Sequence, residues 1–555
     1  MFPGNHLRLK EEVTSPSCRR RQASFSRHQI PAFTSRIDNN NNNKIPTRKS
    51  PTNPEQREIL LDFVSYIQNS LPGELEDDEV VLLREVMSSL PADVGGQQGA
   101  LMVESLLYRL VAEWNTAVMA ENMGREEVWR PSTDDFKIAL AAWDGLERED
   151  GEMAVTHILS ILSDQRELFL QKNLESVRPD LETFQIIFRI LAALTRERNV
   201  DGRAWVVFQS LSDFDVEPDP KIYTSMIAIA AKSRQKDAAS RAEKLLREAV
   251  ERYPPKMSDG IVSGIGVDAF NVVLTSWAKS REQNGPKRAE QLLVYMDQID
   301  QENGSLGLCS PNVSSFTSLI DAYAQQNDWE SVCQCEMILN RLLEQYLDGN
   351  DDLEPNVATW TIVISAWARL SKKNNRSAAD KADRLLKRME SLYQDGRVSF
   401  GPDSIAYVTC MNAFAFSQNA NGPPRAEEIL DEMNERYLDG DDTMKPSARS
   451  IKVVIDSWIK FGDMDRAEDL LEKYEDILQA EADANPNVAE VLKDIYRSML
   501  FGWSKCDDPE KAGFFLKDMV DNGMQPDSFC FDRSVTAEVS FMLLHFNILT
   551  HFVCC

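Results

Sequence analysis

One helical pattern recurs along most of this chain, and it constrains the fold more than any other feature of the sequence. Each copy starts at an aromatic or branched residue and has apolar residues three, four and seven positions later. The copies start at Phe136, Phe184, Tyr223, Phe270, Phe316, Trp360, Tyr407, Ile451 and Tyr496. This spacing puts the four side chains on one face of a helix. We expect that face to pack inward as core rather than to serve as an aromatic stacking platform.

A second helix follows the first in each predicted unit. It is anchored by a small residue that lets the two helices approach closely, and apolar partners follow at the same offsets; Ala289, Ala382 and Ala426 are examples. Most units close with proline followed by Asp or Asn, at Pro179, Pro218, Pro311, Pro355, Pro402, Pro486 and Pro526. Proline cannot continue a helix, and the Asp or Asn behind it can cap the next one.

Such a two-helix unit exposes an apolar face until a neighbouring unit covers it, so the units must stack. We therefore predict an all-α fold, an α-solenoid that forms a right-handed superhelix of about nine helix-turn-helix repeats. In this prediction, residues 1–50 form a basic, low-complexity leader and residues 51–130 a helical N-terminal capping region. Residues 131–530 form the repeat array, and residues 531–555 form an atypical apolar tail.

Charge and reactive residues limit the functions open to this chain. The formal net charge is −28, so a polyanionic partner would need a local groove of Lys and Arg. The nine cysteines lack CxxC spacing, and none of the five histidines pairs with another histidine or a carboxylate at metal or catalytic spacing. The acidic turns at 348–352 and 439–442 are expected to be solvated loops rather than cation sites. We predict no enzymatic activity, no metal and no cofactor.

The two ends of the chain differ from the array. The first 50 residues are rich in Arg, Ser and Thr, which is typical of an organellar transit peptide; Glu11 and Glu12 depart from that pattern, and a disordered basic leader is the alternative. An organellar location follows, with the mitochondrion favoured over the plastid. The tail is apolar, but Glu538 and His545 interrupt it, so we expect a capping helix or an incorrectly assigned chain end rather than a membrane span.

The closing Pro-Asp or Pro-Asn, the aromatic residue four positions later and the Ala-to-Met second helix together resemble the pentatricopeptide repeat (PPR) family. The unit from Lys493 to Asp527 has the family's length of 35 residues without an insertion. The resemblance covers roughly residues 131 to 530. The tetratricopeptide repeat is the competing family, but it lacks the regular Pro-Asp or Pro-Asn close.

The resemblance implies that single-stranded RNA lies in the concave groove, with one base per repeat. In the family, a base is read by the residue directly after the first-helix aromatic and by the residue behind the closing proline. Three adjacent units carry polar pairs that match, namely Asn271 with Asn312, Thr317 with Asn356, and Thr361 with Asp403. By analogy with the family, these pairs suggest pyrimidine, adenine and guanine in succession.

Other positions depart from the family's pattern. The first reading position of the flanking units holds Lys137, Gln185, Val408, Lys452 and Arg497. The family also has an aliphatic residue two places before the aromatic, where it wedges between bases. Only Ile405 conforms, whereas Asp268, Ser314 and Ala358 do not. Base stacking is therefore expected to be weak.

Five units place a cation nine residues after the starting residue. These cations are Lys232, Lys279, Arg369, Lys460 and Lys505. A solenoid would align them along the groove, within reach of RNA phosphates. The alternative is that a cation near the end of a helix only interacts with the helix dipole.

The sequence thus predicts an RNA-binding helical-repeat protein that acts in organellar RNA processing, stability or translation by occupying a single strand. Protein partners of RNA metabolism are possible, and no membrane association is expected. The alternative function is a protein–protein interaction scaffold built on the same solenoid, which the acidity of the chain and the non-matching reading positions would favour.

Overall fold

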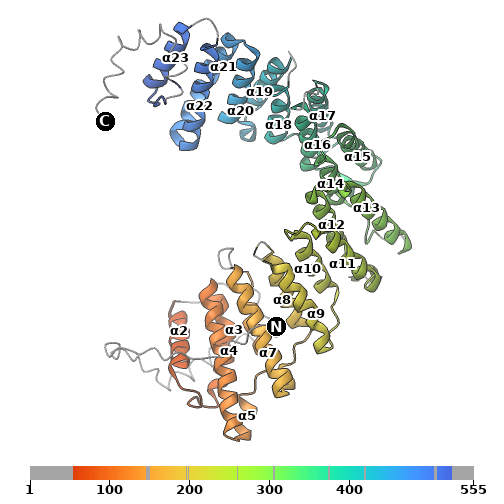
Figure 1. Cartoon of the computed structure of the whole chain (residues 1–555), viewed down its shortest axis with the longest axis vertical. Coiled ribbons are helices and arrows are strands. Elements are labelled where there is room, and N and C mark those ends of the chain that lie inside the picture. The colour runs from red at the N-terminus through yellow and green to blue at the C-terminus, as the bar shows by residue number, and fades with distance from the viewer. Residues whose placement is uncertain are drawn as a thin grey trace. The chain divides into compact units, whose positions relative to one another are not determined.

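Helices make up almost all of the chain that the computed structural model describes (Figure 1). That part is residues 54–530, apart from gaps at 95, 146–150, 196, 198, 259–260, 304–306, 373–375, 418–420, 506–508 and 528–529. The predicted all-α solenoid is confirmed for these residues. The predicted leader and tail lie outside them. No helix in the described ranges is both long and apolar enough to cross a membrane.

The chain divides into two compact units, residues 1–235 and 236–555. The first unit opens with α2 (Pro54–Asn69), α3 (Glu79–Asp93), α4 (Gly96–Met119) and α5 (Met123–Val128). The repeat helices of this unit are α6 (Thr133–Ala142), α7 (Gly151–Lys172), α8 (Leu181–Ala193), α9 (Val200–Ser210) and α10 (Pro220–Lys232). Short 3-10 turns lie at Glu175–Val177 and Leu211–Phe214.

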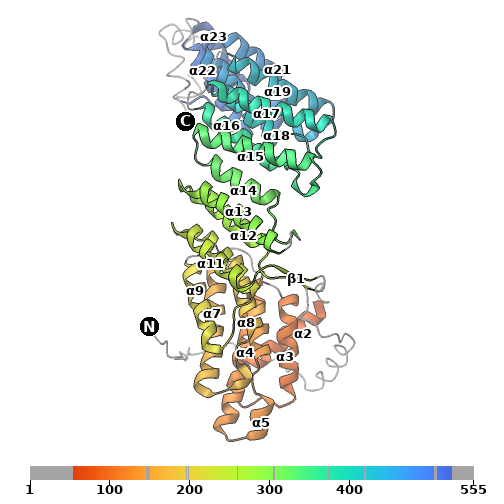
Figure 2. The ribbon, with the colours of Figure 1, turned by 90° about the vertical axis from the view of Figure 1, so that its right-hand side faces the viewer.

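The second unit begins with α11 (Ala238–Arg252) and contains six helical hairpins after it. Their first helices are α12 (Val267–Ser280), α14 (Val313–Ala324), α16 (Val357–Ser371), α18 (Ser404–Ala415), α20 (Ala448–Phe461) and α22 (Pro486–Trp503). Their second helices are α13 (Gly285–Glu302), α15 (Trp329–Leu347), α17 (Arg376–Gln394), α19 (Gly422–Leu438), α21 (Met464–Ala484) and α23 (Pro509–Asp521). Between α11 and α12, β1 (Lys256–Ser258) and β2 (Ile261–Ser263) form a small antiparallel hairpin, which the helical periodicity did not predict (Figure 2).

The residue behind the closing proline starts the next first helix, as its side chain predicts. Carboxylate or amide oxygens accept a hydrogen bond from the third helical N–H at α8, α10, α14, α16 and α18, and the capping residues are Asp180, Asp219, Asn312, Asn356 and Asp403. One assignment is wrong. Asn487 lies inside α22, because Pro486 takes the first helical position and Asn485 provides the cap.

The starting residues of the first helices pack into the core, as expected. Eight of the nine are at most 2% exposed, and Phe316 is half-buried. The anchors Ala289, Ala382 and Ala426 are fully buried, so each hairpin closes tightly. From Trp360 onwards these side chains join one continuous core that extends from Ile320 to Cys530. The stripe is therefore structural, and it cannot stack on a ligand.

First and second helices have different neighbours within the second unit. Each first helix packs against the next, from α12 through α14, α16, α18 and α20 to α22. Successive second helices are joined by ion pairs, namely Lys381 with Glu336, Arg425 with Asp383, Lys473 with Asp431, and Lys511 with Asp465, at 2.6–3.2 Å. The first helices therefore form the inner layer of this unit's curve and the second helices its outer layer (Figure 1).

A hydrogen bond that the sequence analysis did not anticipate joins some neighbouring repeats. The glutamate after the small anchor of a second helix accepts from the aromatic residue that stands seven positions after the starting residue of the next first helix. The pairs are Trp277 with Glu243 at 3.0 Å, Tyr323 with Glu290 at 3.3 Å, and Trp458 with Glu427 at 2.9 Å. Cys333 takes the glutamate position opposite Trp367, and the buried indole N–H of Trp367 has no hydrogen-bond partner in the described chain.

Candidate nucleic-acid interface

The first helices of the second unit form a continuous inner face. Because they pack side by side, residues at equivalent positions of α12, α14 and α16 lie in a row with one member per repeat. The two predicted reading positions both belong to this layer, since one lies in the first turns of a first helix and the other caps the next first helix. The layer thus brings Asn271 into contact with Asn312 and joins Thr317 to Asn356 through Thr359.

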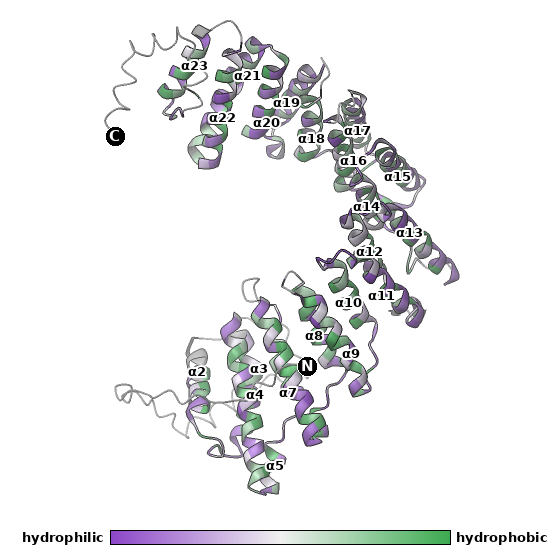
Figure 3. Ribbon diagram, viewed as in Figure 1, coloured by the Kyte–Doolittle hydropathy of each residue, from purple (hydrophilic) through white to green (hydrophobic). Residues whose placement is uncertain are grey.

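Negative charge is concentrated on the outer layer of this unit. The second helix α21 carries eight acidic and two basic residues, and α19 carries five acidic and two basic ones. Among first helices, α18 has no charged residue, and α20 has three basic residues and one acidic. Figure 3 shows strongly hydrophilic segments on outer helices such as α13 and α17, although α17 departs from the charge pattern with five basic and three acidic residues. The acidity of the whole chain therefore does not describe the inner face.

The pair Asn271 and Asn312 forms a closed hydrogen-bond cluster with Ser315. The Asn271 side-chain N–H donates to Asn312 Oδ1 at 3.2 Å, and the Ser315 hydroxyl donates to Asn271 Oδ1 at 2.6 Å. Asn312 Oδ1 also accepts the Ser315 backbone N–H at 3.1 Å, which caps α14. The Asn312 oxygen is thus occupied, and its amide N–H₂ is the group that remains for a ligand.

The pair Thr317 and Asn356 is joined through Thr359. The hydroxyls of Thr317 and Thr359 lie 2.7 Å apart, and Asn356 Oδ1 accepts both the backbone N–H and the hydroxyl of Thr359 at 2.9 Å. Asn356 is exposed. As at Asn312, its oxygen holds the helix start, which leaves its amide N–H₂ as the group to bind a ligand.

The pair Thr361 and Asp403 has the fewest hydrogen bonds of the three within the described residues. Asp403 Oδ1 caps α18 by accepting the Ala406 N–H at 2.8 Å. The Thr361 hydroxyl is buried without a hydrogen-bond partner among the described residues. This pair therefore presents the second carboxylate oxygen of Asp403, which makes it an acceptor where the two pairs before it offer amide donors.

Sequence reasoning missed Ser315 and Thr359, which hold the reading residues in place. Both stand three residues after an N-cap, and a hydroxyl residue at that spacing was the available signal. Their hydrogen bonds fix the side-chain orientation of the cap, so the group that faces the ligand is set by the local helix start.

The flanking reading positions are occupied by contacts within the chain. Lys137 lies 2.7 Å from both Asp180 and Glu182. Burial alone would lower the pKa of Lys137, but the hydrogen bonds to these two carboxylates outweigh it and raise the pKa. Gln185 donates to Asp219 at 2.6 Å, and Arg497 pairs with Asp527. In each of these pairs, the reading residue and the residue behind the next closing proline bind each other.

The other two flanking positions offer little to a base. Lys452 pairs with Asp456 of its own helix at 2.7 Å. Val408 is half-buried against the core and cannot form a hydrogen bond through its side chain. The polar inner face therefore centres on α12, α14, α16 and the start of α18.

The predicted phosphate contacts have different surroundings. Lys232, in the first unit, and Lys279 are exposed at the ends of α10 and α12. Arg369 is half-buried and donates to the carbonyl of Ala324, the last residue of α14, at 2.8 Å. Its contact matches the alternative in which a cation offsets helix-terminal carbonyls.

The remaining two predicted cations lie over aromatic rings. Lys460 is 4.9 Å from the ring centre of Phe416, and Lys505, which lies beyond the end of α22, is 4.1 Å from that of Phe501. Both lysines are exposed. The equivalent positions of the α14 and α18 units hold Gln325 and Phe416, so the row of cations is interrupted twice.

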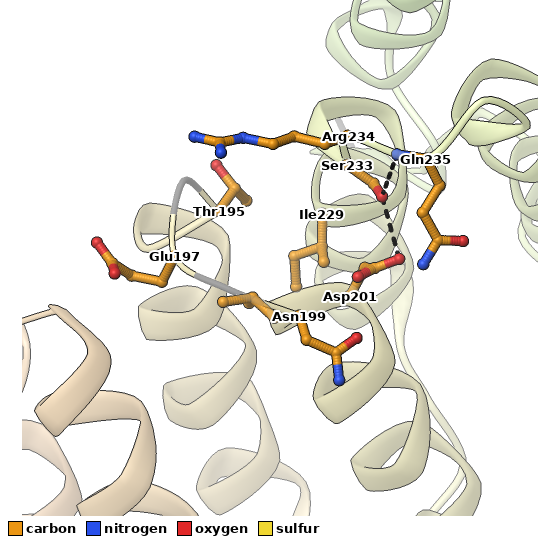
Figure 4. Close-up of a pocket in the computed structure, with 9 residues that line it drawn as sticks. Thr195, Glu197, Asn199, Asp201, Ile229, Ser233, Arg234 and Gln235 are labelled. Atoms are coloured by element: carbon orange, nitrogen blue, oxygen red, sulfur yellow. Dashed lines mark hydrogen bonds between the residues drawn. The ribbon is translucent and has the colours of Figure 1, made fainter.

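A small polar pocket of roughly 270 Å³ lies in the first unit (Figure 4). It is lined where α8 and α10 end and α9 begins, next to Lys232. The Ser233 hydroxyl donates to Asp201 at 3.0 Å and accepts the Gln235 N–H at 3.3 Å, and Arg234 extends across the opening towards Thr195. Hydrogen bonds within the chain thus occupy the side chains of Asp201 and Ser233. In the described ranges, no group of three or more possible metal ligands is found.

Comparison with known proteins identifies related sequences. The family model described as PPR repeat matches residues 314–335 and 494–524. A pentatricopeptide repeat-containing protein of Arabidopsis thaliana is 23% identical over 268 residues, which cover 48% of this chain and 38% of that protein. This chain therefore matches well under half the length of that relative.

Two solved structures of the pentatricopeptide repeat protein PPR10 are also similar. One is a complex with an 18-nt psaJ RNA element; it covers 92% of this chain and 68% of its own, with 16% identity and a TM-score of 0.36. The other is PPR10 from maize, with coverage of 95% and 70%, 14% identity and a TM-score of 0.31.

Proposed function

Because this chain belongs to the pentatricopeptide repeat family, we propose that it binds single-stranded RNA on the inner face of its second unit. The observation that carries the proposal is the row of three polar pairs on consecutive first helices. Each pair combines a residue inside one first helix with the cap of the next. An unstacked base that lies across the two helix starts would meet both members.

The hydrogen bonds within each pair leave one group of the cap for a base, and the family resemblance implies which base it is. The amide N–H₂ of Asn312 would donate to an acceptor on a pyrimidine, and that of Asn356 to the N1 acceptor of adenine. The second carboxylate oxygen of Asp403 would accept from the N1–H and N2–H₂ groups of guanine. The donor and acceptor pattern thus separates guanine from the other two bases, and the order of pyrimidine and adenine is taken from the family resemblance, in which the two pairs differ by Asn271 and Thr317.

The cations would contribute affinity without sequence preference. Lys279, Lys460 and Lys505 are exposed in the same unit as the three pairs, and phosphate neutralisation supplies much of the binding energy for a nucleic acid. The concentration of acidic residues on outer helices favours RNA binding at the inner face over the alternative function as a protein scaffold. A basic protein partner would be attracted to the outer helices α19 and α21, whereas a polyanion would be repelled from them towards the inner face.

In the cell, such binding would protect or mask a single-stranded segment, and so act in the processing, stability or translation of an organellar transcript. The Arg-rich first 50 residues support import into an organelle, with the mitochondrion favoured. No catalytic group is needed for this role, because occupation of the strand excludes other factors.

The proposal is tested by a gel-shift titration of the full chain with a random single-stranded RNA pool at low salt. We expect submicromolar binding, and the absence of any shift at micromolar protein would refute the proposal. A triple variant, Asn271→Ala, Thr317→Ala and Thr361→Ala, removes reading groups and keeps all the N-caps. Its affinity for a uridine-rich strand that contains one UAG triplet should fall at least tenfold.

A matched control removes three exposed polar side chains from second helices, by Gln291→Ala, Ser391→Ala and Gln394→Ala. This control should bind like the parent chain. Equal losses in both triple variants would mean that the RNA does not use the inner face.

A further inference from the structure

Two lysines from different helices meet over one exposed aromatic ring in the second unit. Lys372, which caps the end of α16, lies 4.5 Å from the ring centre of Phe416, and Lys460 of α20 lies 4.9 Å from it. Phe416 caps the end of α18, the helix between the other two, and is 39% exposed. The ends of three consecutive first helices thus form one cluster.

Several other lysines of the second unit are held by carboxylates. Lys381, Lys387, Lys445, Lys473 and Lys511 each form an ion pair. For Lys372 and Lys460, by contrast, no ion pair is found within the residues that the structure describes. Both are exposed, so their ammonium groups keep donors for a ligand.

The ring limits where the two ammonium groups can be. A lysine side chain on the surface samples many rotamers, and attraction to the face of an aromatic ring restricts it. Since each nitrogen lies within about 5 Å of the same ring centre, the two are at most about 10 Å apart. Two positive charges are therefore kept close together despite their mutual repulsion, which favours an anion between or beside them.

Attraction to helix ends does not by itself account for this arrangement. A cation at a helix end can offset the last carbonyls, as Arg369 does with Ala324. Such a role needs one cation per helix end and no aromatic residue. Here Phe416 stands nine residues after Tyr407, at the position where other repeats have their cation. Its ring is approached by one lysine from each neighbouring repeat.

We propose that Lys372, Phe416 and Lys460 form a two-lysine clamp that binds consecutive phosphates of a single RNA strand. This inference rests on the proposed function, and it adds a fixed anchoring point for the backbone at the end of α18, opposite the start that Asp403 caps. Phe416 holds the lysines apart from nearby acids and in reach of the strand, and the lysines neutralise the phosphates.

The salt dependence of RNA binding tests the clamp. Each neutralised phosphate of a single strand contributes roughly −0.7 to the slope of log K against log salt. The double variant Lys372→Gln and Lys460→Gln should therefore have a slope less negative by about 1.4. A control that removes two cations from second helices, Lys287→Gln with Arg384→Gln, should change the slope by much less.

Substitution of the ring separates its role from that of the charges. Phe416→Leu keeps both lysines and should weaken binding by roughly two- to fivefold, because the lysines are no longer held. Phe416→Trp should restore binding, since Trp is the best partner for a cation. Because Phe416 is partly exposed, far-ultraviolet circular dichroism is expected to show intact helices in both variants.

The possible results distinguish the clamp from the proposed function. If the parent chain binds RNA and the double variant has the same slope as its control, the clamp is wrong and the proposed function stands. The clamp is also wrong if Phe416→Leu binds like the parent. If the parent chain does not bind RNA at all, both are refuted.

Discussion

Exchange of one capping residue should change which base a repeat prefers while leaving the fold intact. The α14 and α16 units differ in their reading pairs only at the cap, where Asn356 stands in one and Asp403 in the other, since the first position is threonine in both. Asp403→Asn therefore gives its unit the same pair as its neighbour. The reciprocal variant is Asn356→Asp.

The expected effect on binding follows from the groups that face the base. Asp403 uses one oxygen to cap α18 and has the other as an acceptor, whereas an asparagine there would present an amide donor. A well-placed pair of hydrogen bonds to a base is worth about 1–3 kcal/mol of discrimination. At about 1.4 kcal/mol per factor of ten, the preference should change roughly five- to hundredfold.

The expected effect on stability is smaller. Asparagine and aspartate are nearly equal as N-caps, so α18 keeps its first hydrogen bond. Loss of the negative charge at the helix start costs about 0.3–1 kcal/mol at most. The expected loss of unfolding free energy is therefore no larger than the smallest expected change in base discrimination. The variant should remain folded.

The assay compares two uridine-rich strands that differ in one triplet, UAG or UAA. The parent chain should prefer UAG, and Asp403→Asn should prefer UAA. Asp403→Asn removes a negative charge and will therefore bind every RNA more tightly. The quantity to measure is thus the ratio of the dissociation constants for the two strands. Asn356→Asp should prefer UGG over UAG. If neither variant changes its ratio while circular dichroism shows intact helices, these caps do not read bases.

Three further outcomes are expected. If all five predicted cations contact RNA, the slope of log K against log salt for the parent chain should be about −3.5, and a slope near zero would exclude phosphate contact. Cys333→Glu should give the buried Trp367 indole a partner and raise the free energy of unfolding in urea by about 1 kcal/mol; no increase would mean that the glutamate does not reach it. Hydrogen bonds from Lys137 and Thr183 outweigh burial and lower the pKa of Asp180, so its stabilisation is complete above its ordinary value of 3.8 and is lost as the pH falls below that value. Asp180→Asn should therefore reduce the loss of stability as the pH falls below 3.8, and an unchanged loss would show that this pair does not contribute.

The repeat architecture could be predicted from the sequence because it depends on spacing. Apolar residues three, four and seven positions apart specify a helical face, and Phe184, Trp360 and Ile451 are all buried as this predicts. Proline followed by Asp or Asn specifies a helix start when the proline ends the preceding segment. At Pro486 the proline begins the helix, which the same sequence pattern permits, and the predicted boundary was wrong.

The occupancy of the candidate site could not be predicted from spacing. Lys137 and Gln185 stand at the same position as Asn271, and only the folded structure shows that the residue behind the next closing proline binds each of them. Likewise, nothing in the sequence indicates that Lys372 and Lys460 approach Phe416, because the three residues come from different repeats. Contacts between repeats depend on how the hairpins stack.

The overlap between capping and base reading limits which residues can serve at the second reading position. A side chain there must accept a backbone N–H to start the helix, and Asn, Asp, Ser and Thr do this best. The same four residues offer a donor or an acceptor to a base, so Asn312, Asn356 and Asp403 can do both only because one atom caps the helix and another remains. The first reading position has no such duty, and it varies from Asn271 to Val408. Changes of base preference without loss of stability should therefore come from exchanges among capping residues, whereas changes at the first position decide whether a repeat binds a base at all.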